Sequence, residues 1–255
     1  MPFLRPVDGG GIRQFKDKFI KETTMKIENV KIYDMAESIV ASGYPMRTNT
    51  DEESIEVVKQ TIDNGTFGKT PATKAIYNRA VQLGNATGGH DQMLTGILAA
   101  FDLTLTNKAW IEAERYRYLC FVSSQSTVHR INRFNLKLQY NEYVDPAIIQ
   151  IMQKKTQEYN DMLTTLKFLK ENIHSPLEVV NLEDEIEQKY LELLYNNPAG
   201  FEITARITTN YRCLKNVYKQ RYNHKLPEWR EFCAYIKEYF PYFKEFCLLK
   251  SKSAQ

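Results

Sequence analysis

The 255-residue sequence has little cysteine, glycine or proline and no long apolar run. Its four cysteines are too few for a disulfide framework, and none belongs to a Cys-x-x-Cys pair, so we expect buried, inert thiols. The small numbers of glycine and proline exclude a collagen-like or low-complexity chain. No segment approaches the roughly 18 apolar residues of a membrane span, and residues 1–13 contain no apolar secretory core. We therefore expect a soluble cytoplasmic protein with no membrane partner.

The sequence also lacks a strong excess of one charge sign. It has 34 Lys and Arg against 31 Asp and Glu, which gives a net charge of +3. This balance excludes a strongly basic chain of the kind that binds nucleic-acid polymers. Charged residues make up 25% and hydrophobic residues 43%, as in an ordinary globular protein. Composition names no function, so the function has to come from local motifs.

Local patterns predict an N-terminal extension over residues 1–24 and a single domain over residues 25–255. Apolar and polar residues alternate at 25–33 and 101–106, which predicts strands. Helical periodicity and cap residues predict helices over the ranges 50–64, 70–83, 92–100, 108–122, 145–172, 182–195, 208–222 and 227–248. The predicted fold class is α+β, helix-rich with a small sheet.

The first segment with chemical potential follows the second strand. Glu112, Glu114, Arg115 and Arg117 interrupt an apolar helical pattern, and such charges are costly against a core unless they are paired or face a polar ligand. At about 100° per residue, the two arginines point about 200° apart and cannot serve one pocket from one face of a helix. Glu–Arg pairing on a helix surface is the alternative interpretation.

The second segment is residues 210–221, where an apolar stripe has polar ends. The stripe consists of Asn210, Leu214, Val217 and Arg221, while Arg212 and Asn216 lie four residues apart on another face. Such a helix can bury its centre and offer an amide and a guanidinium to a ligand. The guanidinium fork suits phosphates and planar rings that carry carbonyl groups. An amphipathic surface helix is the alternative.

A third segment, Gly89-His90-Asp91, precedes a predicted helix, where a lone histidine can equally be structural. The four histidines show no His-x-His or His-x-x-x-His spacing, so we expect no metal site. The sequence contains no Gly-x-Gly-x-x-Gly, no P-loop and no Gly-x-Ser-x-Gly. Cys120 has no evident histidine partner for nucleophilic catalysis.

Several segments occur in a distinctive order along the chain. They are Gly89-His90-Asp91, the strand at 101–106, Arg115-Tyr116-Arg117, Ser123 to Thr127, and Asn210-x-Arg212-x-x-x-Asn216-x-x-x-x-Arg221, followed by His224 and Trp229-Arg230-Glu231. In this order they resemble the flavin-dependent thymidylate synthases. The resemblance covers about residues 89–130 and 198–235, and the spacing within 210–221 is its more specific half.

The resemblance implies a mixed α/β fold and a homotetramer with flavin sites between subunits. It implies transfer of a methyl or hydroxymethyl group from methylenetetrahydrofolate to C5 of a pyrimidine deoxynucleotide, in the family's case dUMP to dTMP. Reduced FAD would supply the hydride and NADPH would re-reduce the flavin. The chain's partners would be other copies of itself and a pyrimidine nucleotide.

The resemblance also assigns roles to single residues. Arg221 matches the arginine that polarises the pyrimidine ring. The cofactor-binding matches are His90, Arg115, Arg117, Asn210, Asn216 and His224. The substrate-binding matches are Glu112, Ser123, Gln125, Ser126 and Arg130.

The sequence departs from the family pattern in the nucleotide half of the site. Tyr116 replaces the middle histidine of Arg-His-Arg, Cys120 replaces a serine, and Gly96 stands where the family has an active-site histidine. Glu112 replaces a glutamine that contacts the substrate, and its carboxylate favours a donor such as the exocyclic amine of cytosine. The alternatives are therefore a divergent member that binds another nucleotide, a binding or interaction protein on the same scaffold, and an all-helical interaction protein without a small-molecule site.

Overall fold

The computed structural model describes residues 25–50, 52–172 and 176–249, so the predicted extension lies outside the described residues. The core of the fold is an antiparallel sheet with the strand order β1-β2-β4-β3. Its strands are β1 (Lys26–Tyr33), β2 (Leu98–Thr106), β3 (Cys120–Ser124) and β4 (Glu202–Asn210). The α+β class expected from the sequence is confirmed.

The two central strands pair along their full length, from Leu98 opposite Asn210 to Thr106 opposite Glu202. Alternate residues of β2 point into the core, as the period of two in its sequence predicts. Because β2 and β4 run antiparallel, α4 and α8 leave the sheet at opposite ends, and the last residue of α8, Arg221, reaches Glu112 of α4.

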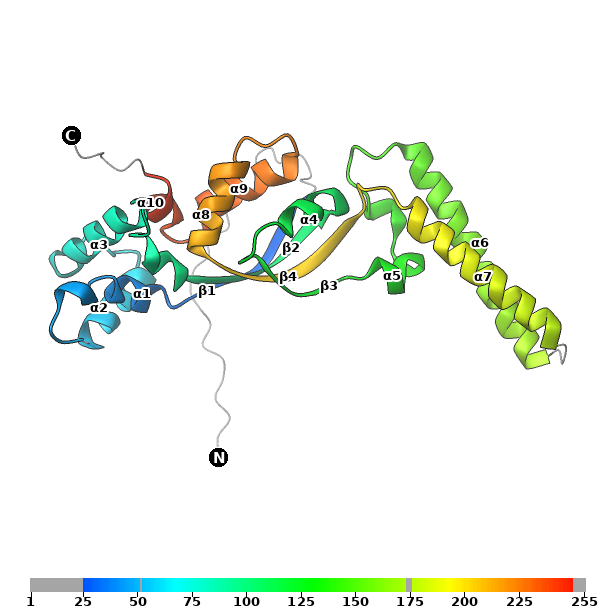
Figure 1. The fold of residues 1–255 in the computed structure, drawn as a ribbon, viewed down its shortest axis with the longest axis horizontal. Coiled ribbons are helices and arrows are strands. Elements are labelled where there is room, and N and C mark those ends of the chain that lie inside the picture. Colours follow the sequence, from blue (N-terminus) through cyan, green and yellow to red (C-terminus); the bar gives the residue numbers. More distant parts are fainter. Residues whose placement is uncertain (1–24, 51, 173–175, 250–255) are drawn as a thin grey trace, which may run out of the picture.

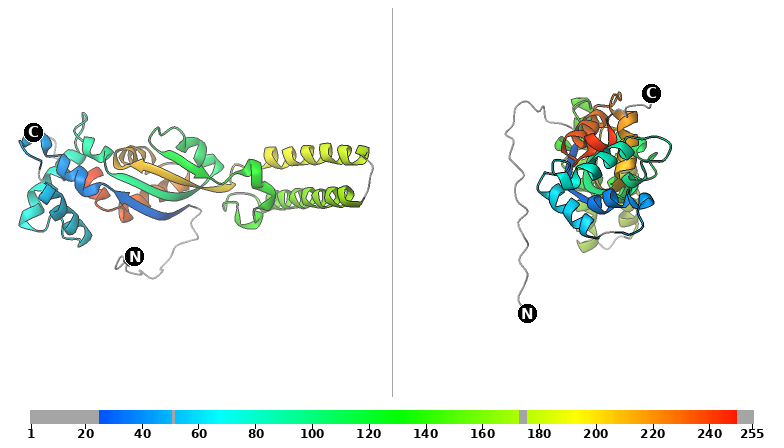
Figure 2. Two further views of the ribbon diagram at one scale, coloured as in Figure 1. Left: turned by 90° about the horizontal axis from the view of Figure 1, so that it is seen from below. Right: turned by 90° about the vertical axis from the view of Figure 1, so that its left-hand side faces the viewer.

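Helices surround the sheet unevenly. They are α1 (Met35–Ala41), α2 (Glu52–Asp63), α3 (Pro71–Gly84), α4 (Asn107–Ala113), α5 (Thr127–Arg130), α6 (Pro146–Asn172), α7 (Pro176–Asn196), α8 (Tyr211–Arg221), α9 (Pro227–Tyr239) and α10 (Phe243–Cys247). Helices α8 and α9 lie on one face of the sheet (Figure 1). Seen from below, the strands lie in front of these helices (Figure 2), so the helices leave the other sheet face uncovered.

Helices α6 and α7 form an antiparallel hairpin that projects from the end of the molecule opposite α1 to α3 (Figures 1 and 2). The predicted start of α6 is confirmed, because the Asp145 carboxylate accepts a hydrogen bond from the Ala147 backbone N–H at 2.8 Å. The hairpin has a core of its own that includes Met152, Ile186 and Leu193. No helix within the described residues is long and apolar enough to cross a bilayer.

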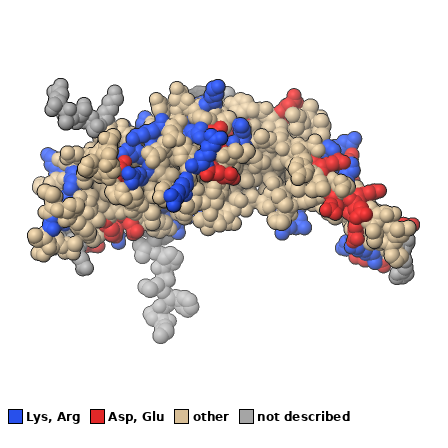
Figure 3. Space-filling model, viewed as in Figure 1, with Lys and Arg blue, Asp and Glu red and all other residues tan. Residues whose placement is uncertain are grey.

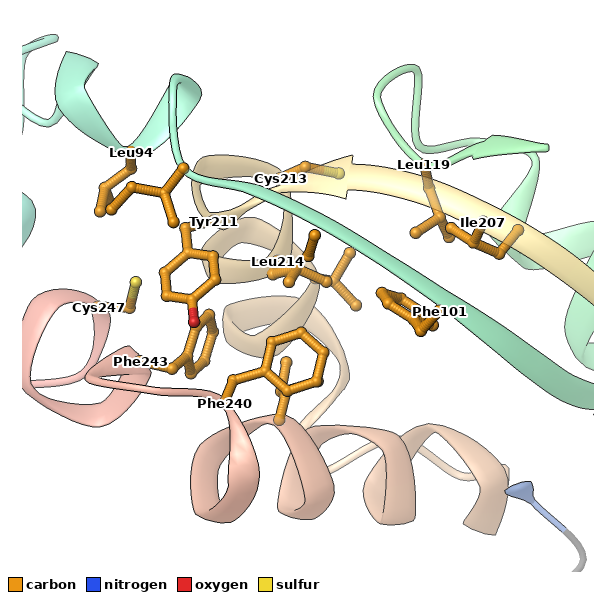
Figure 4. Packing of buried hydrophobic residues seen from close by; sticks show 14 of the residues in the cluster. Leu94, Phe101, Leu119, Ile207, Tyr211, Cys213, Leu214, Phe240, Phe243 and Cys247 are labelled. Carbon is orange, nitrogen blue, oxygen red and sulfur yellow. The ribbon is translucent and has the colours of Figure 1, made fainter. Parts of the chain in front are cut away.

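Aromatic side chains fill the space between the sheet and helices α8 to α10 (Figure 4). Tyr211 is fully buried against Phe240 and Phe243, and its hydroxyl donates to the Pro241 carbonyl at 2.8 Å. Leu214 and Val217, the apolar centre of the predicted stripe, are also fully buried. Helix α8 is therefore fixed in the core by one face and free to present the other.

Five predicted helices need correction, and one of them, 182–195, begins six residues earlier at Pro176, because proline fits the first turn of a helix. Residues 92–95 form only a 3-10 turn, η2 (Gln92–Thr95), and β2 begins at Leu98 because its pairing with β4 extends that far. The predicted helix 108–122 ends at Ala113, and Cys120 starts β3. The predicted helix 208–222 begins at Tyr211, since the residues before it belong to β4.

The predicted helix 227–248 is two helices, α9 and α10, with Pro241 between them. Proline lacks the N–H that the next helical hydrogen bond requires, and Tyr242 has a left-handed φ of 55° that ends the helical path. The short helix α1 and the strand β4 were not predicted at all.

Three of the four cysteines are buried, as expected, but Cys120 is exposed. It lies on the edge strand β3, all five residues of which are exposed. Burial raises the pKa of Cys233 to about 12, so its thiol stays protonated and unreactive at neutral pH.

A buried carboxyl group marks the start of β4. Burial raises the pKa of Glu202 to about 7, and the nearby Glu228 and Glu231 add to the shift. One carboxyl oxygen of Glu202 is buried without a hydrogen-bond partner among the described residues. Glu228 is almost fully buried and accepts a hydrogen bond from the Thr106 hydroxyl at 2.7 Å.

We expect Glu202→Gln to raise the free energy of unfolding by about 1 to 2 kcal/mol above pH 7 and to have little effect near pH 4. The folded protein holds this carboxyl protonated where the unfolded chain ionises it, so its contribution is complete below pH 4.5 and is lost as pH rises through about 7. Urea denaturation at pH 4.5 and pH 8 measures the difference. Glu187→Gln, at an exposed position of α7, is the control and should be neutral at both pH values.

Candidate functional site

A cavity of about 670 Å³ opens between η2, the segment 115–118 and the exposed face of α8. Three guanidinium groups and two amides stand in its wall: those of Arg115, Arg117, Arg212, Asn210 and Asn216. Gln92, Thr95, Tyr116, Tyr118, Cys213 and Gln220 complete the described lining, in which there is no Asp or Glu. The cavity therefore offers hydrogen-bond donors and positive charge to an anionic ligand.

The segment 115–118 presents both of its arginines to this cavity because α4 ends before it. The chain turns after Ala113, whose carbonyl accepts a hydrogen bond from the Tyr116 N–H at 3.0 Å. A second turn follows, in which the Tyr116 carbonyl accepts from the Leu119 N–H at 2.9 Å. The expectation that Arg115 and Arg117 cannot share a pocket is thus wrong, since it assumed a continuous helix. In the turn, Arg115 and Arg117 both line the same cavity although they are two positions apart.

Asn210 and Asn216 reach the cavity from the start and the middle of α8. Asn210 is the N-cap of this helix, and its side-chain oxygen accepts the Cys213 N–H at 2.9 Å. Its amide nitrogen is left to donate elsewhere. Asn216 is exposed on the face of α8 that does not enter the core.

Arg212 is held in the cavity wall by an ionic network behind it. Its Nε lies 3.2 Å from the Asp91 carboxylate, and its guanidinium donates to Gln92 at 2.6 Å. Asp91 also pairs at 2.7 Å with Lys215, whose side chain is only 2% exposed. The Lys215 ammonium donates in addition to the Gly84 carbonyl at 2.6 Å. Figure 3 shows the resulting concentration of positive side chains over α8 and the adjoining segment.

Arg221 lies outside this cavity, in a cluster at the other end of α8. It donates to the Glu112 carboxylate at 2.5 Å and to the Tyr116 hydroxyl at 2.8 Å. Its guanidinium carbon stands 5.3 Å from the Trp229 ring centre, and only 11% of the side chain is exposed. His224 Nε2 lies 2.7 Å from Arg221 and 3.3 Å from Glu112. The cluster thus unites three predicted site residues, Glu112, Arg221 and His224.

Tyr116 connects the two groups of residues. Its ring lines the cavity, while its hydroxyl accepts from Arg221 and donates to Gln220 at 2.9 Å. Burial raises the pKa of Tyr116, although the neighbouring Arg221 opposes the shift, so the hydroxyl stays a donor at neutral pH. Tyr116 is therefore an uncharged bridge between the cavity and the cluster.

The remaining predicted residues lie apart from both. Ser123 belongs to the exposed strand β3, and Gln125 exchanges hydrogen bonds with the backbone of Thr204. Ser126 precedes α5, and Arg130 is exposed at the end of that helix. His90 is exposed in the turn before η2 and is not part of the cavity lining.

Several cavity residues were not predicted as ligands. Arg212 was noted only as part of the α8 pattern, and its spacing of four from Asn216 was a usable signal. Gln92, Tyr118 and Gln220 carried no signal, because a polar or aromatic residue in a turn or on a helix surface is ordinary in any chain.

A flavin dinucleotide is compatible with these residues. The three arginines can bind a diphosphate, the amides can pair with ring carbonyl groups, and the tyrosine rings offer stacking surfaces. A volume of about 670 Å³ falls within the range of cofactor pockets, which is about 300 to 1,000 Å³. Arg115, Arg117, Asn210 and Asn216 would hold the group in this cavity.

Comparison with known proteins gives a similarity of structure only. No protein-family model and no curated protein matches the sequence. The structure is similar to a flavin-dependent thymidylate synthase from Helicobacter pylori in complex with FAD and dUMP, with a TM-score of 0.48 and 16% identity over 89% of this chain and 100% of the other. It is also similar to a UMP/dUMP methylase from Streptomyces cacaoi bound to 5-Br dUMP, with a TM-score of 0.48 and 12% identity over 84% and 88%. At such values the function has to be inferred from the side chains of this chain.

Proposed function

We propose that the chain is a flavin-dependent enzyme that transfers a one-carbon group to C5 of a pyrimidine deoxynucleotide, with dUMP converted to dTMP. The observation that carries this proposal is the convergence of Arg115 and Arg117 with Asn210 and Asn216 on one cavity without carboxylates. These two segments are about 95 residues apart, and the sequence resemblance assigns the same four residues to the flavin. An ordinary amphipathic surface helix would not be expected to line one cavity together with Arg115 and Arg117.

The chain's own contribution is positioning and polarisation. Arg115 and Arg117 bind the cofactor's anionic part, and Asn210 and Asn216 orient its ring. Reduced FAD, when bound, supplies the hydride. Tyr116 lines the cavity and accepts a hydrogen bond from Arg221, so it fixes the position of Arg221 relative to the cavity wall. The Arg221 guanidinium polarises a carbonyl of the pyrimidine ring.

The wider proposal includes methylenetetrahydrofolate as one-carbon donor, NADPH as reductant, a homotetramer and a cytoplasmic location. The predicted substrate residues of the β3–α5 segment lie outside the cavity of their own chain: Ser123 on the exposed edge strand, Gln125 and Ser126 in the connection, and Arg130 at the end of α5. This placement supports a nucleotide site completed between subunits, to which these residues and His90 would contribute from one protomer.

A specific observation favours a second candidate substrate, a cytosine deoxynucleotide. Glu112 stands beside Arg221, so the cluster presents an acceptor and a donor side by side. A cytosine ring offers an exocyclic amine next to ring acceptors and matches this pair, whereas uracil offers a carbonyl at the same position.

Loss of FAD binding in an Arg115→Ala/Arg117→Ala double variant is the test of the cofactor site. We expect the dissociation constant for FAD to rise at least 100-fold, because the variant lacks two charge-assisted contacts. FAD titration followed by flavin fluorescence measures it. Lys108→Ala, at an exposed position of α4, is the matched control and should bind normally.

Equal FAD affinity in the double variant and the wild type would contradict the proposed site. A colourless wild-type protein that binds no FAD at millimolar concentration but binds dUMP would favour a nucleotide-binding protein without flavin chemistry. Bleaching of bound FAD by NADPH, followed by a methylated product from dUMP or dCMP, would establish the reaction and choose between the two substrates.

A further inference from the structure

A second positively charged cavity lies beside the second half of α8. It has a volume of about 440 Å³ and is formed where α8, α9 and α10 converge. Each of these helices contributes one exposed lysine, Lys219, Lys237 and Lys244, and the described lining includes no Asp or Glu. The described linings of this cavity and of the cavity between η2 and the segment 115–118 have no residue in common, so the two cavities are separate.

The three lysines have no ion-pair partner among the described residues. The nearest acidic positions in sequence, Glu238 and Glu245, are adjacent to two of them but do not line the cavity. Three ammonium groups around one hollow repel each other, and a multivalent anion between them would relieve that repulsion. The lysine cavity therefore suits a phosphate-bearing ligand of more than one charge.

A tyrosine-lined hollow of about 790 Å³ adjoins the lysine cavity. The two share Tyr218, Tyr222 and Lys237, so they are continuous. The rings of Tyr218 and Tyr222 are stacked, with centres 5.8 Å apart and planes 11° apart, and Tyr222 is 59% exposed. Stacked tyrosines of this kind offer a flat surface to an aromatic ring.

Charge fixes the direction in which a ligand would lie. The tyrosine-lined hollow contains three carboxylates and three cations, so its charges balance, and the carboxylates can accept hydrogen bonds from a base or a sugar; these residues are Glu28, Glu231, Glu238, Lys26, Arg230 and Lys237. The lysine cavity contains no carboxylate. An aromatic ring would therefore lie on the tyrosines and the phosphates among the lysines.

We propose that this pair of hollows is a second ligand site, which binds a nucleoside polyphosphate through Lys219, Lys237 and Lys244 with its base stacked on Tyr222. The site is independent of the cavity assigned to FAD. It is built by helices α8, α9 and α10, whereas the FAD cavity is built by η2, the segment 115–118 and different residues of α8.

The experiment is calorimetric titration of the full-length protein with ATP and with inorganic tripolyphosphate, both without divalent metal at low salt. We expect the Lys219→Ala/Lys237→Ala/Lys244→Ala variant to bind both probes at least 100-fold more weakly, and Tyr222→Ala to bind ATP roughly tenfold more weakly with tripolyphosphate affinity unchanged. All four side chains are exposed, so the variants keep the core intact. Lys59→Ala/Lys74→Ala/Lys108→Ala removes three exposed lysines elsewhere and should leave both affinities unchanged.

Wild-type affinity for ATP in the triple variant would overturn the proposal, as would an affinity for tripolyphosphate equal to that for ATP in the wild type. The Arg115→Ala/Arg117→Ala variant separates the two cavities. It should keep ATP binding while losing FAD, and loss of both ligands in this variant would place the polyphosphate in the FAD cavity and refute the second site. Failure of FAD to bind leaves the ATP measurement valid.

Discussion

Asp91→Ala is expected to lower the free energy of unfolding by about 3 to 5 kcal/mol, among the largest effects of any single substitution in this protein. Lys215 is 2% exposed and its ammonium lies 2.7 Å from the Asp91 carboxylate. Without this carboxylate, the buried Lys215 ammonium keeps its positive charge but has no anionic partner among the described residues. Its remaining hydrogen bonds there go to backbone carbonyl groups, such as that of Gly84. Urea denaturation at pH 7 measures the loss.

The same variant should also weaken FAD binding, because Arg212 loses the partner that holds it in the cavity wall. Replacing both members of the buried pair, in Asp91→Ala/Lys215→Met, removes the unpaired charge and should restore most of the stability but not the FAD affinity. Asp184→Ala, on the exposed face of α7, is the matched control and should change stability by less than about 0.5 kcal/mol. An Asp91→Ala protein within 1 kcal/mol of the wild type would show that the pair is not stabilising.

The buried pair also shows where sequence reasoning stops. The turn at Gly89-His90-Asp91 was noted for its histidine, yet the aspartate is the residue that the fold uses. A lysine in an amphipathic helix normally reaches solvent, so nothing in the sequence marked Lys215 as buried. Its partner is 124 positions away, and only the tertiary fold brings the two together.

The secondary structure could be predicted where the apolar residues of a segment followed one clear period, two for a strand or 3.6 for a helix. The strands at 26–33 and 101–106 and the helices α2, α3 and α6 follow their apolar spacing. Strand β3 was missed because it has only five residues, all exposed, so burial imposes no alternation. The end of α4 was missed because Glu and Arg favour helix, whereas in the fold α4 ends at Ala113 and its Trp110 packs on Phe121 of β3 and donates to the Ile203 carbonyl of β4.

The candidate site was half predictable for a related reason. Residues five or six positions apart along a helix and its cap keep their spacing whatever surrounds the helix, so Asn210, Asn216 and Arg221 could be found from sequence. The spacing also places Asn216 and Arg221 on different faces, and the structure agrees, because Asn216 lines the cavity and Arg221 contacts Glu112. The segments that complete the cavity, η2 and 115–118, could not be predicted from this spacing, because they are distant from α8 in sequence.

Arg221→Lys is expected to lower the turnover number for pyrimidine methylation by about 100- to 1,000-fold while FAD affinity stays within threefold of the wild type. The guanidinium lies between the rings of Tyr116 and Trp229, at 5.6 and 5.3 Å, and donates to Glu112 from a fixed plane. An ammonium keeps the charge but has neither the plane nor the fork. Steady-state turnover with saturating FAD, and FAD titration of the same preparation, measure the two quantities separately.

Arg230→Lys is the matched control, because that guanidinium donates only to the backbone carbonyl groups of His224 and Lys225. It should keep wild-type turnover. A turnover number within threefold of the wild type in Arg221→Lys would exclude ring polarisation by this residue, and joint loss of FAD and stability would show that it serves the fold instead.

The neighbouring carboxylate then decides which ring is polarised. Glu112→Gln keeps the shape beside Arg221 but removes the negative charge and adds a donor. Because Arg221 donates to this side chain, the amide oxygen would face Arg221 and the amide nitrogen would face the ligand. The nitrogen pairs with the uracil carbonyl and cannot accept from the cytosine amine, so we expect the ratio of kcat/KM for dUMP to that for dCMP to rise at least tenfold. An unchanged ratio would mean that Glu112 only neutralises Arg221, and that the selectivity for the base lies with residues of the exposed edge strand.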